Sequence, residues 1–226
     1  MRYASVVPGR FLDRPNRFIA HVELAGRVET VHVKNTSRCR ELLTPGCTVY
    51  CAHEPSPTRK TAYDLIAAEK GGRLINLDAQ APNRLFHEWA AAGGYGAMPC
   101  AIRPEFTWGD SRFDFRLEWE SGIRLVEVKG VTLEREGRTF FPDAPTERGL
   151  KHLRGLMRAA ESGMEAAVVF VIQMEGAVSF SPADDIHPAF GEALRLAAAR
   201  GVGVKAYDCT ITPQELCIHG AVPVLL

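Results

Sequence analysis

Apolar and polar residues alternate along most of the first 78 residues of the chain. Residues 18–24 and 27–33 alternate, and the Ala25-Gly26 pair between them is typical of the turn of a β-hairpin. Other short runs with strand character are residues 47–51, 61–69 and 73–77, and one helical turn is expected near residues 38–43. Five short strands in this length predict a small β-barrel, for which an OB-type barrel is our preferred architecture.

The pattern changes after a break at residues 78–82. Asn83 is expected to cap a helix that ends at Gly93-Gly94. The expected elements that follow are strands at residues 101–108, 112–119, 123–131, 166–172 and 202–211, and helices at about 146–161 and 188–200. The run 166–172 is wholly apolar, which is typical of a strand buried on both faces. This order predicts a mixed sheet flanked by helices, so we expect an α/β (α+β) protein with an OB-like domain at residues 1–80 and a second domain at residues 81–226.

Composition excludes several classes of protein. The 226 residues are 46% hydrophobic and 24% charged, as in an ordinary globular protein. No run is long enough to cross a membrane, and the first ten residues lack the apolar core of a signal peptide, so we expect a cytoplasmic protein without a membrane partner. The six cysteines form no CxxC pair and have no matching histidine spacing, which makes zinc an unfavoured ligand.

Charge is divided unevenly although the whole chain is neutral. Residues 1–78 contain 12 Lys and Arg against 8 Asp and Glu, whereas the remaining residues contain 15 against 19. A basic first part and an acidic second part fit a protein in which one part binds phosphate and the other holds cations. Chance variation in surface charge is the alternative.

The expected strand over residues 123–131 contains charge where a sheet is usually apolar. Glu127 and Lys129 should point to one face and Val126 and Val128 to the other, because side chains alternate along a strand. Gly130 then allows the strand end to bend away. A glutamate followed two residues later by a lysine is common in solvated strands, so this pair alone is a weak indication of chemistry.

Asp114 on the preceding expected strand strengthens the indication. Phe113, Phe115 and Leu117 are expected to share one face of that strand, with Asp114 on the opposite face as a spatial neighbour of Glu127. Carboxylates on adjoining strands are costly to desolvate without a counter-charge. A divalent metal ion that meets a phosphodiester would supply that charge.

The expected helix over residues 146–161 has a row of basic residues. Arg148, Lys151, His152 and Gly155 follow one another at offsets that place them on one face. Near paired carboxylates such a row indicates contact with phosphate. An ordinary solvated helix face is the alternative, and it stays open.

Glu88 is the remaining candidate for the carboxylate site. It lies beside the apolar face of the first expected helix, where a glutamate would reach either solvent or a bound metal ion. His87 is expected to point elsewhere, as a surface residue.

These residues resemble a known family. Asp114 followed by Glu127-Val128-Lys129, with a glutamate on the preceding helix, is similar to the PD-(D/E)XK nuclease core, although Phe113 replaces the proline of that pattern. Four longer segments, residues 7–18, 32–36, 111–115 and 141–149, resemble the sugar fermentation stimulation protein A family over nearly the whole chain. The resemblance implies an N-terminal OB-like barrel followed by a restriction-endonuclease-like domain, with DNA binding and a link to the regulation of sugar, particularly maltose, metabolism.

The resemblance also implies a mechanism. Asp114, Glu127 and Glu88 would bind Mg²⁺ or Mn²⁺, with the Val128 carbonyl as a further ligand, and Lys129 would orient the attacking water. DNA, or alternatively RNA, would contact a set of basic residues: Arg14, Arg17, Lys34, Arg38, Arg40, Arg148 and Lys151. A DNA-binding regulator without catalysis is the rival interpretation. An enzyme of small-molecule sugar metabolism ranks last, because the sequence has no glycine-rich phosphate loop.

Overall fold

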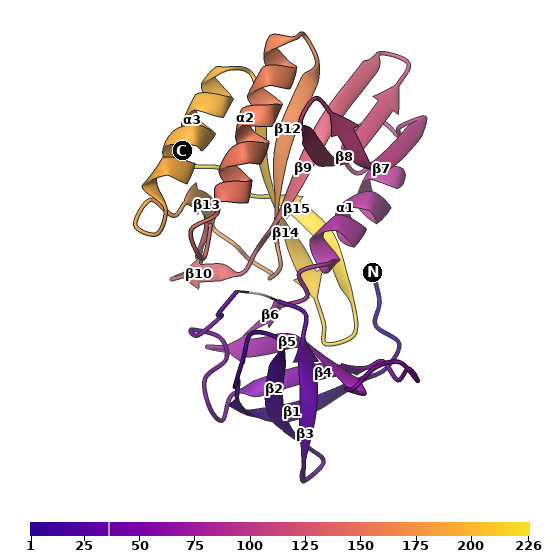
Figure 1. Ribbon diagram of the computed structural model, residues 1–226, viewed down its shortest axis with the longest axis vertical. Coiled ribbons are helices and arrows are strands. Elements are labelled where there is room, and N and C mark those ends of the chain that lie inside the picture. Colours follow the sequence, from indigo (N-terminus) through magenta and orange to yellow (C-terminus); the bar gives the residue numbers. More distant parts are fainter. Residues whose placement is uncertain (36) are drawn as a thin grey trace.

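A computed structural model describes residues 1–35 and 37–226, so Thr36, within the segment 32–36 used above, lies outside the described residues. The chain forms a barrel and a larger α/β body, which meet where the barrel's last strand passes to the first helix (Figure 1). The junction at residues 77–80 coincides with the break in the sequence pattern.

The barrel has six strands, β1 Val6–Asp13, β2 Ile19–Leu24, β3 Arg27–Val33, β4 Thr48–His53, β5 Tyr63–Lys70 and β6 Arg73–Asn76. Their order is β3-β2-β1-β4-β5-β6, and a short parallel pairing between β3 and β5 closes the barrel. Alternate residues of β2, among them Ala20, Val22 and Leu24, are buried inside, as the alternating pattern predicts. The expected OB-type barrel is confirmed.

Two features of the barrel differ from the sequence expectations. β1 was not expected, because Pro8 and Gly9 in its middle are usually strand breakers. Gly9 is tolerated there because a Cβ at this position would lie only 2.6 Å from Val22, so the close approach of β1 and β2 requires glycine. The expected helical turn near residues 38–43 is present but shorter, as one turn over residues 40–42 in which the Leu43 amide donates to the Cys39 carbonyl at 2.8 Å, as in an α-helix.

The larger body contains a six-stranded mixed sheet in the order β15-β14-β12-β9-β8-β7. Its strands are β7 Ala101–Trp108, β8 Ser111–Trp119, β9 Gly122–Val131, β12 Glu165–Ile172, β14 Gly203–Ile211 and β15 Leu216–Ala221. β12 lies between β9 and β14, parallel to both, and its apolar run is buried as predicted. A small second sheet, not expected from the sequence, contains β10 Leu133–Arg135, β11 Arg138–Phe141 and β13 Ser179–Pro182.

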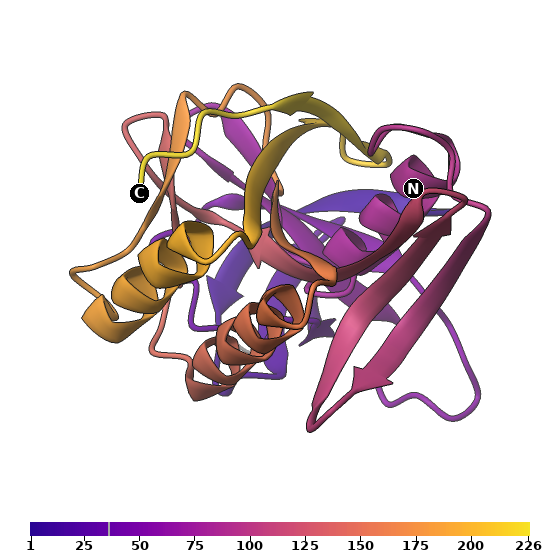
Figure 2. The same ribbon diagram turned by 90° about the horizontal axis from the view of Figure 1, so that it is seen from above.

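Helices cover both faces of the large sheet. α2 Glu147–Glu161 and α3 Pro188–Ala199 lie side by side on one face, and α1 Ala81–Ala91 lies on the other (Figures 1 and 2). Asn83 is not the N-cap of α1 as expected, because the helix begins earlier, with Gln80 as N-cap and Pro82 in its first turn. The side chain of Asn83 is thereby released for another contact.

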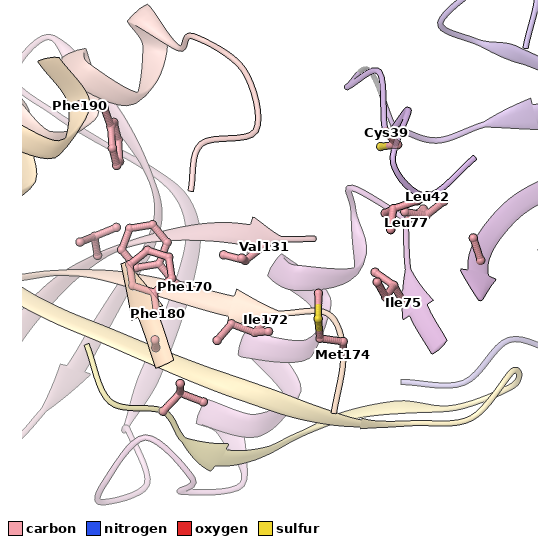
Figure 3. Close-up of a cluster of buried hydrophobic side chains, with 14 of the residues drawn as sticks. Cys39, Leu42, Ile75, Leu77, Val131, Phe170, Ile172, Met174, Phe180 and Phe190 are labelled. Atoms are coloured by element: carbon pink, nitrogen blue, oxygen red, sulfur yellow. The ribbon is translucent and has the colours of Figure 1, made fainter. Parts of the chain in front are cut away.

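Barrel and sheet share one hydrophobic core. Ile75 and Leu77 at the end of the barrel lie next to Ile172 and Met174 at the end of β12, within one continuous cluster of buried side chains (Figure 3). A buried polar contact adjoins this cluster, in which the Gln173 amide donates to Asn76 Oδ1 at 2.8 Å. No helix among the described residues is long and apolar enough to span a membrane.

Candidate functional site

The two faces of β9 meet different surroundings. Val126 and Val128 pack in the apolar cluster beneath α1, whereas Leu125 belongs to the cluster beneath α2. Glu127 and Lys129 are on the α2 side, where both contact His152. The expected division of the strand into two faces is confirmed.

Asp114 lies where β8 and β9 separate. The paired residues of these strands end at Phe115 and Val126, and beyond that point the Val128 amide donates to Asp114 Oδ2 at 2.8 Å. The carboxylate thus occupies the place of a main-chain acceptor. Asn83 of α1 donates to the other oxygen, Oδ1, at 2.9 Å. Both carboxylate oxygens are therefore held by rigid elements.

One expectation about β8 is wrong because β8 and β9 separate. Phe113, Phe115 and Leu117 do not share a face, because Phe113 packs in the cluster beneath α2 while the other two pack beneath α1. Once the ladder to β9 ends, β8 is free to twist, and Phe113 turns toward the α2 residue His152, with ring centroids 6.5 Å apart.

α2 approaches the sheet closely because of a glycine. A Cβ on Gly155 would lie 2.6 Å from Ser111 Oγ and 3.0 Å from Phe113 Cζ, so a larger residue does not fit there without a shift. The helix begins at Thr146, whose hydroxyl accepts from the Gly149 amide at 3.0 Å. This cap and this close approach fix the position of α2 relative to β9, and so the position at which His152 contacts Glu127.

Glu127 is the centre of the charged cluster. Its Oε1 accepts hydrogen bonds from Lys129 Nζ and from His152 Nδ1, and Nζ lies 3.5 Å from Nδ1. Burial alone would raise the pKa of Glu127, but the hydrogen bond from His152 and the charge of Lys129 outweigh it and hold the pKa below its usual value. Glu127 is therefore an anion in the folded protein at neutral pH.

The pKa of Asp114 is shifted in the opposite direction, above its usual value. Burial, followed by the nearby carboxylate of Glu127, raises the pKa of Asp114 despite the hydrogen bond from the Val128 amide. Two carboxylates that repel each other in a buried place are the usual environment of a bound cation.

One further observation tests whether a metal ion fits. Glu127 Oε2 is buried and has no hydrogen-bond partner among the described residues. A buried carboxylate oxygen without a partner is unfavourable, and together with Asp114 it offers the hard oxygen ligands that Mg²⁺ and Mn²⁺ prefer. The two carboxylates therefore fit a divalent cation.

Glu88 does not join these two carboxylates. Its side chain is 51% exposed and forms an ion pair with the amino group of Met1 at 2.8 Å. In the part of the chain that the structure describes, no three His, Cys, Asp or Glu side chains are grouped to hold a metal ion. Glu88 does line a cavity of about 400 Å³ together with Asp114, and so does His87, which the sequence placed apart from the site.

The row of basic residues on α2 is divided in the structure. Arg148 and Lys151 are exposed, whereas His152 and Gly155 are buried against the sheet. The expectation that all four form one basic face is wrong, because the boundary between the solvated and the packed side of the helix passes through the row.

The predicted basic residues of the barrel also have different surroundings. Lys34 Nζ lies 2.9 Å from a carboxylate oxygen of the buried Asp64, so its charge is already paired. Arg14 donates to main-chain carbonyls. Arg17, Arg38 and Arg40 line one hollow of the barrel surface, and no ion pair joins them to any described residue.

Sequence reasoning missed two residues that contact the candidate site directly. His152 was grouped with exposed basic residues, and Asn83 was taken as a helix cap. Two neighbouring residues could have indicated their true positions. Gly155 permits α2 to pack closely on the sheet, which buries His152, and Pro82 marks the first turn of α1, which places Asn83 inside the helix.

Comparison with known proteins agrees with this architecture. Residues 80–215 match the family described as sugar fermentation stimulation protein RE domain, and residues 12–77 match the SfsA N-terminal OB domain. The chain is 51% identical over 216 residues to the sugar fermentation stimulation protein homolog of Desulfitobacterium hafniense (strain DSM 10664 / DCB-2), covering 96% of this chain and 94% of that protein. It is 46% identical to the homolog of Clostridium beijerinckii over the full length of both chains.

A solved structure is also similar. The structure of Pyrococcus furiosus SfsA in complex with Ca²⁺ superposes with a TM-score of 0.89 at 28% sequence identity, covering 100% of this chain and 98% of that chain. Both domains and their arrangement are therefore shared with that protein. The chain belongs to the sugar fermentation stimulation protein family.

Proposed function

We propose that this protein is a nuclease that depends on Mg²⁺ or Mn²⁺ and cuts DNA, and that it acts through DNA in the regulation of sugar metabolism. The observation that supports the proposal most is the buried Oε2 of Glu127, which has no hydrogen-bond partner among the described residues and lies in a cluster with Asp114 and Lys129. The Ca²⁺ complex of the Pyrococcus furiosus protein supports a divalent cation in this family.

Asp114 and Glu127 would hold the cation, which when bound would polarise a phosphate and lower the pKa of an attacking water. Asn83 and the Val128 amide keep the Asp114 carboxylate in one orientation. Lys129, whose side chain is 17% exposed, would present its positive charge to the phosphoryl oxygens. Glu127 holds Lys129 in that position through the hydrogen bond that it accepts from Nζ.

The proposal is tested by incubating plasmid, single-stranded DNA and RNA with the protein and Mg²⁺ or Mn²⁺. We expect cleavage by the wild type and a loss of roughly 100-fold or more in Lys129→Ala, the order of magnitude seen when one charge-stabilising donor is removed. Lys205→Ala, an exposed lysine on β14, is the matched control and should cleave normally. Calorimetry should show Mn²⁺ binding by the wild type and a clear loss in Asp114→Ala.

A DNA-binding regulator without catalysis remains the rival. Lys129 and His152 already balance part of the charge of Glu127, which is the observation in its favour. Absence of cleavage of every substrate with either metal, combined with salt-dependent retention of DNA, would replace the nuclease proposal by this one.

A further inference from the structure

The barrel surface has a hollow lined mainly by arginines. It measures about 480 Å³, and we call it the arginine hollow; its walls are Phe11, Asp13, Arg14, Asn16, Arg17, Arg38, Arg40, Leu43 and Pro45. Asp13 is the one carboxylate of this lining, and it is hydrogen-bonded to His21 at 2.8 Å. Four guanidinium groups around one carboxylate make the hollow electropositive, which favours an anionic ligand.

Arg14 organises this hollow and does not serve as a free cation. Its guanidinium donates to four main-chain carbonyls, at 2.6 to 2.8 Å, those of Arg17, Asn35, Ser37 and Arg38. These bonds join the loop between β1 and β2 to the segment that follows β3. Arg17 and Arg38 are therefore held in place before any ligand arrives, which reduces the entropy lost on binding.

An exposed aromatic side chain lies beside the arginines. Phe18 is 45% exposed, and the Arg17 guanidinium lies over its ring at 4.7 Å from the centroid. An exposed phenylalanine at a cationic hollow offers a flat surface for a base, and stacking on aromatic side chains is how OB barrels bind single strands without sequence preference.

The arginine hollow continues toward the candidate catalytic site. A second hollow of about 590 Å³ between the two bodies shares Arg38 and Arg40 with it and is bounded on the other side by Leu133 and Asp143. A third hollow, of about 160 Å³, shares Leu133 and Asp143 with the second and reaches Gly130, which follows Lys129 in the sequence.

Three acidic residues line the second hollow, Glu41, Glu134 and Asp143, and one of them is neutralised by ion pairs. Glu134, in the wall of the second hollow, forms ion pairs with Lys70 at 3.1 Å and with Arg73 at 4.0 Å. Because neighbouring hollows share lining residues, we call the three together the groove, which extends from the barrel to Gly130 near the end of β9.

We propose that this groove binds one extended single strand of nucleic acid, with phosphates on Arg38 and Arg40 and a base on Phe18, and leads the strand to Lys129. The assignment of this strand as the substrate rests on the nuclease proposed above. Hollows of 480 and 590 Å³ lie within the range of roughly 300–1,000 Å³ that encloses a small ligand, so they suit successive nucleotides of one strand and are too small to enclose a duplex.

The test measures binding separately from cleavage. Fluorescence anisotropy is recorded with labelled oligothymidylates of increasing length, and with a duplex of the same length as the longest, using the full chain in EDTA so that no metal-dependent reaction occurs. We expect the single strand to bind at least ten-fold more tightly than the duplex, and affinity to rise with length until the groove is filled.

Three variants locate the strand. Arg38→Ala/Arg40→Ala should lower single-strand affinity by roughly ten-fold and reduce the slope of log affinity against log salt by about 1.4, the value for two phosphate contacts. The matched control, Arg27→Ala/Arg200→Ala, removes two exposed arginines elsewhere and should change neither quantity. Phe18→Ala should weaken binding roughly five-fold or more, and Phe18→Tyr should restore it.

Equal affinity for duplex and single strand, or an equal loss in the double variant and its control, overturns the groove. Absence of cleavage with the binding pattern intact rejects the nuclease alone and leaves the groove in place. Cleavage of DNA without the single-strand preference rejects the groove alone.

Discussion

Glu127 is the residue on which most contacts of the candidate site converge. It accepts hydrogen bonds from Lys129 and His152, and its remaining oxygen has no described partner. The properties of the cluster therefore depend on a histidine that belongs to another element of the fold. Because His152 is buried, we propose that it holds the Glu127 carboxylate in position and is not a substrate contact.

Substitution of His152 distinguishes a hydrogen bond from packing. In His152→Asn the amide nitrogen takes approximately the place of Nδ1, the atom that contacts Glu127, whereas in His152→Gln the amide lies farther along the side chain. We expect His152→Ala and His152→Gln to weaken Mn²⁺ affinity or activity by about 10- to 100-fold, the range for residues that orient metal ligands, and His152→Asn to retain most of both. Calorimetry and kcat and KM measurements check this. Equal impairment of Asn and Ala would show that ring volume is what matters.

Asp64 is another buried carboxylate, and it belongs to the barrel. It contacts Lys34, Arg59 and His32 at the point where β3 and β5 close the barrel. Burial opposes its ionisation, but the hydrogen bonds from Arg59 and Lys34 outweigh burial and lower the pKa of Asp64. A lowered pKa in the folded state means that ionised Asp64 stabilises the fold at neutral pH.

The pH dependence of stability follows from the lowered pKa of Asp64. The contribution of Asp64 is present above its unfolded pKa of about 3.9 and is lost as pH falls through its lower folded value. Asp64→Asn should therefore lower the free energy of unfolding by roughly 3 kcal/mol at pH 7, and the difference from wild type should shrink below about pH 4. Urea unfolding at pH 7, 5 and 3 measures the difference in the free energy of unfolding between the variant and the wild type. Glu120→Gln, at an exposed position, should show no such change, and a difference that is constant with pH would contradict the assignment.

At the scale of elements, the site depends on how closely α2 packs on the sheet. Leu150, Leu153 and Met157 form the apolar face of this helix, and all three are buried. The distance between helix and sheet is decided by Gly155, which lies against Ser111 and Phe113. Helical periodicity carries no information about that distance.

Gly155→Val should separate α2 from β8. The added methyl groups have no room, and we expect a loss of about 1–3 kcal/mol in the free energy of unfolding together with weaker Mn²⁺ binding, because His152 moves with the helix. Arg154→Val is the control at the neighbouring exposed position and should cost only about 0.5 kcal/mol through helix propensity. Urea unfolding and calorimetry compare the two variants. Similar losses in both would mean that close packing at Gly155 is unimportant.

At the scale of the whole molecule, barrel and sheet are joined by a shared core and a buried polar contact. The Gln173 side chain donates to Asn76 Oδ1 at 2.8 Å and to the Asp78 carbonyl at 3.0 Å. The main chains also meet, since the Asn76 amide donates to the Gln173 carbonyl at 2.9 Å. Because the hydrophobic core and these hydrogen bonds are shared by both bodies, the two domains should unfold together.

Gln173→Ala should weaken the junction. It removes one of two donors from Asn76 Oδ1 and from the Asp78 carbonyl, which keep the main-chain amides of Asp78 and Ala81 as their other donors. Each lost hydrogen bond contributes about 0.5–1.5 kcal/mol, so we expect a fall in the melting temperature. Differential scanning calorimetry should show one transition for the wild type and a lower transition for the variant. Gln214→Ala removes an exposed glutamine side chain and should leave the transition in place. Two separate transitions in the wild type would show that the domains are independent.

The sequence alone was sufficient for those features that depend on neighbours along the chain. Alternation indicated the barrel strands and the two faces of β9, the apolar run 166–172 indicated a central strand, and the break at residues 78–82 separated the domains. Charge on the strands and the spacing of the carboxylates were enough to nominate Asp114, Glu127 and Lys129 as a site.

Only the tertiary structure decided which side chains meet across elements. It buried His152 against Glu127, turned Arg14 onto four carbonyls and Lys34 onto Asp64, and paired Glu88 with the Met1 amino group. The physical reason is that periodicity describes which face a residue occupies, whereas contacts between elements depend on how closely those faces approach. That approach is set by packing at positions such as Gly155, by strand separation beyond Phe115 and by the junction between the two bodies, none of which has a local signature.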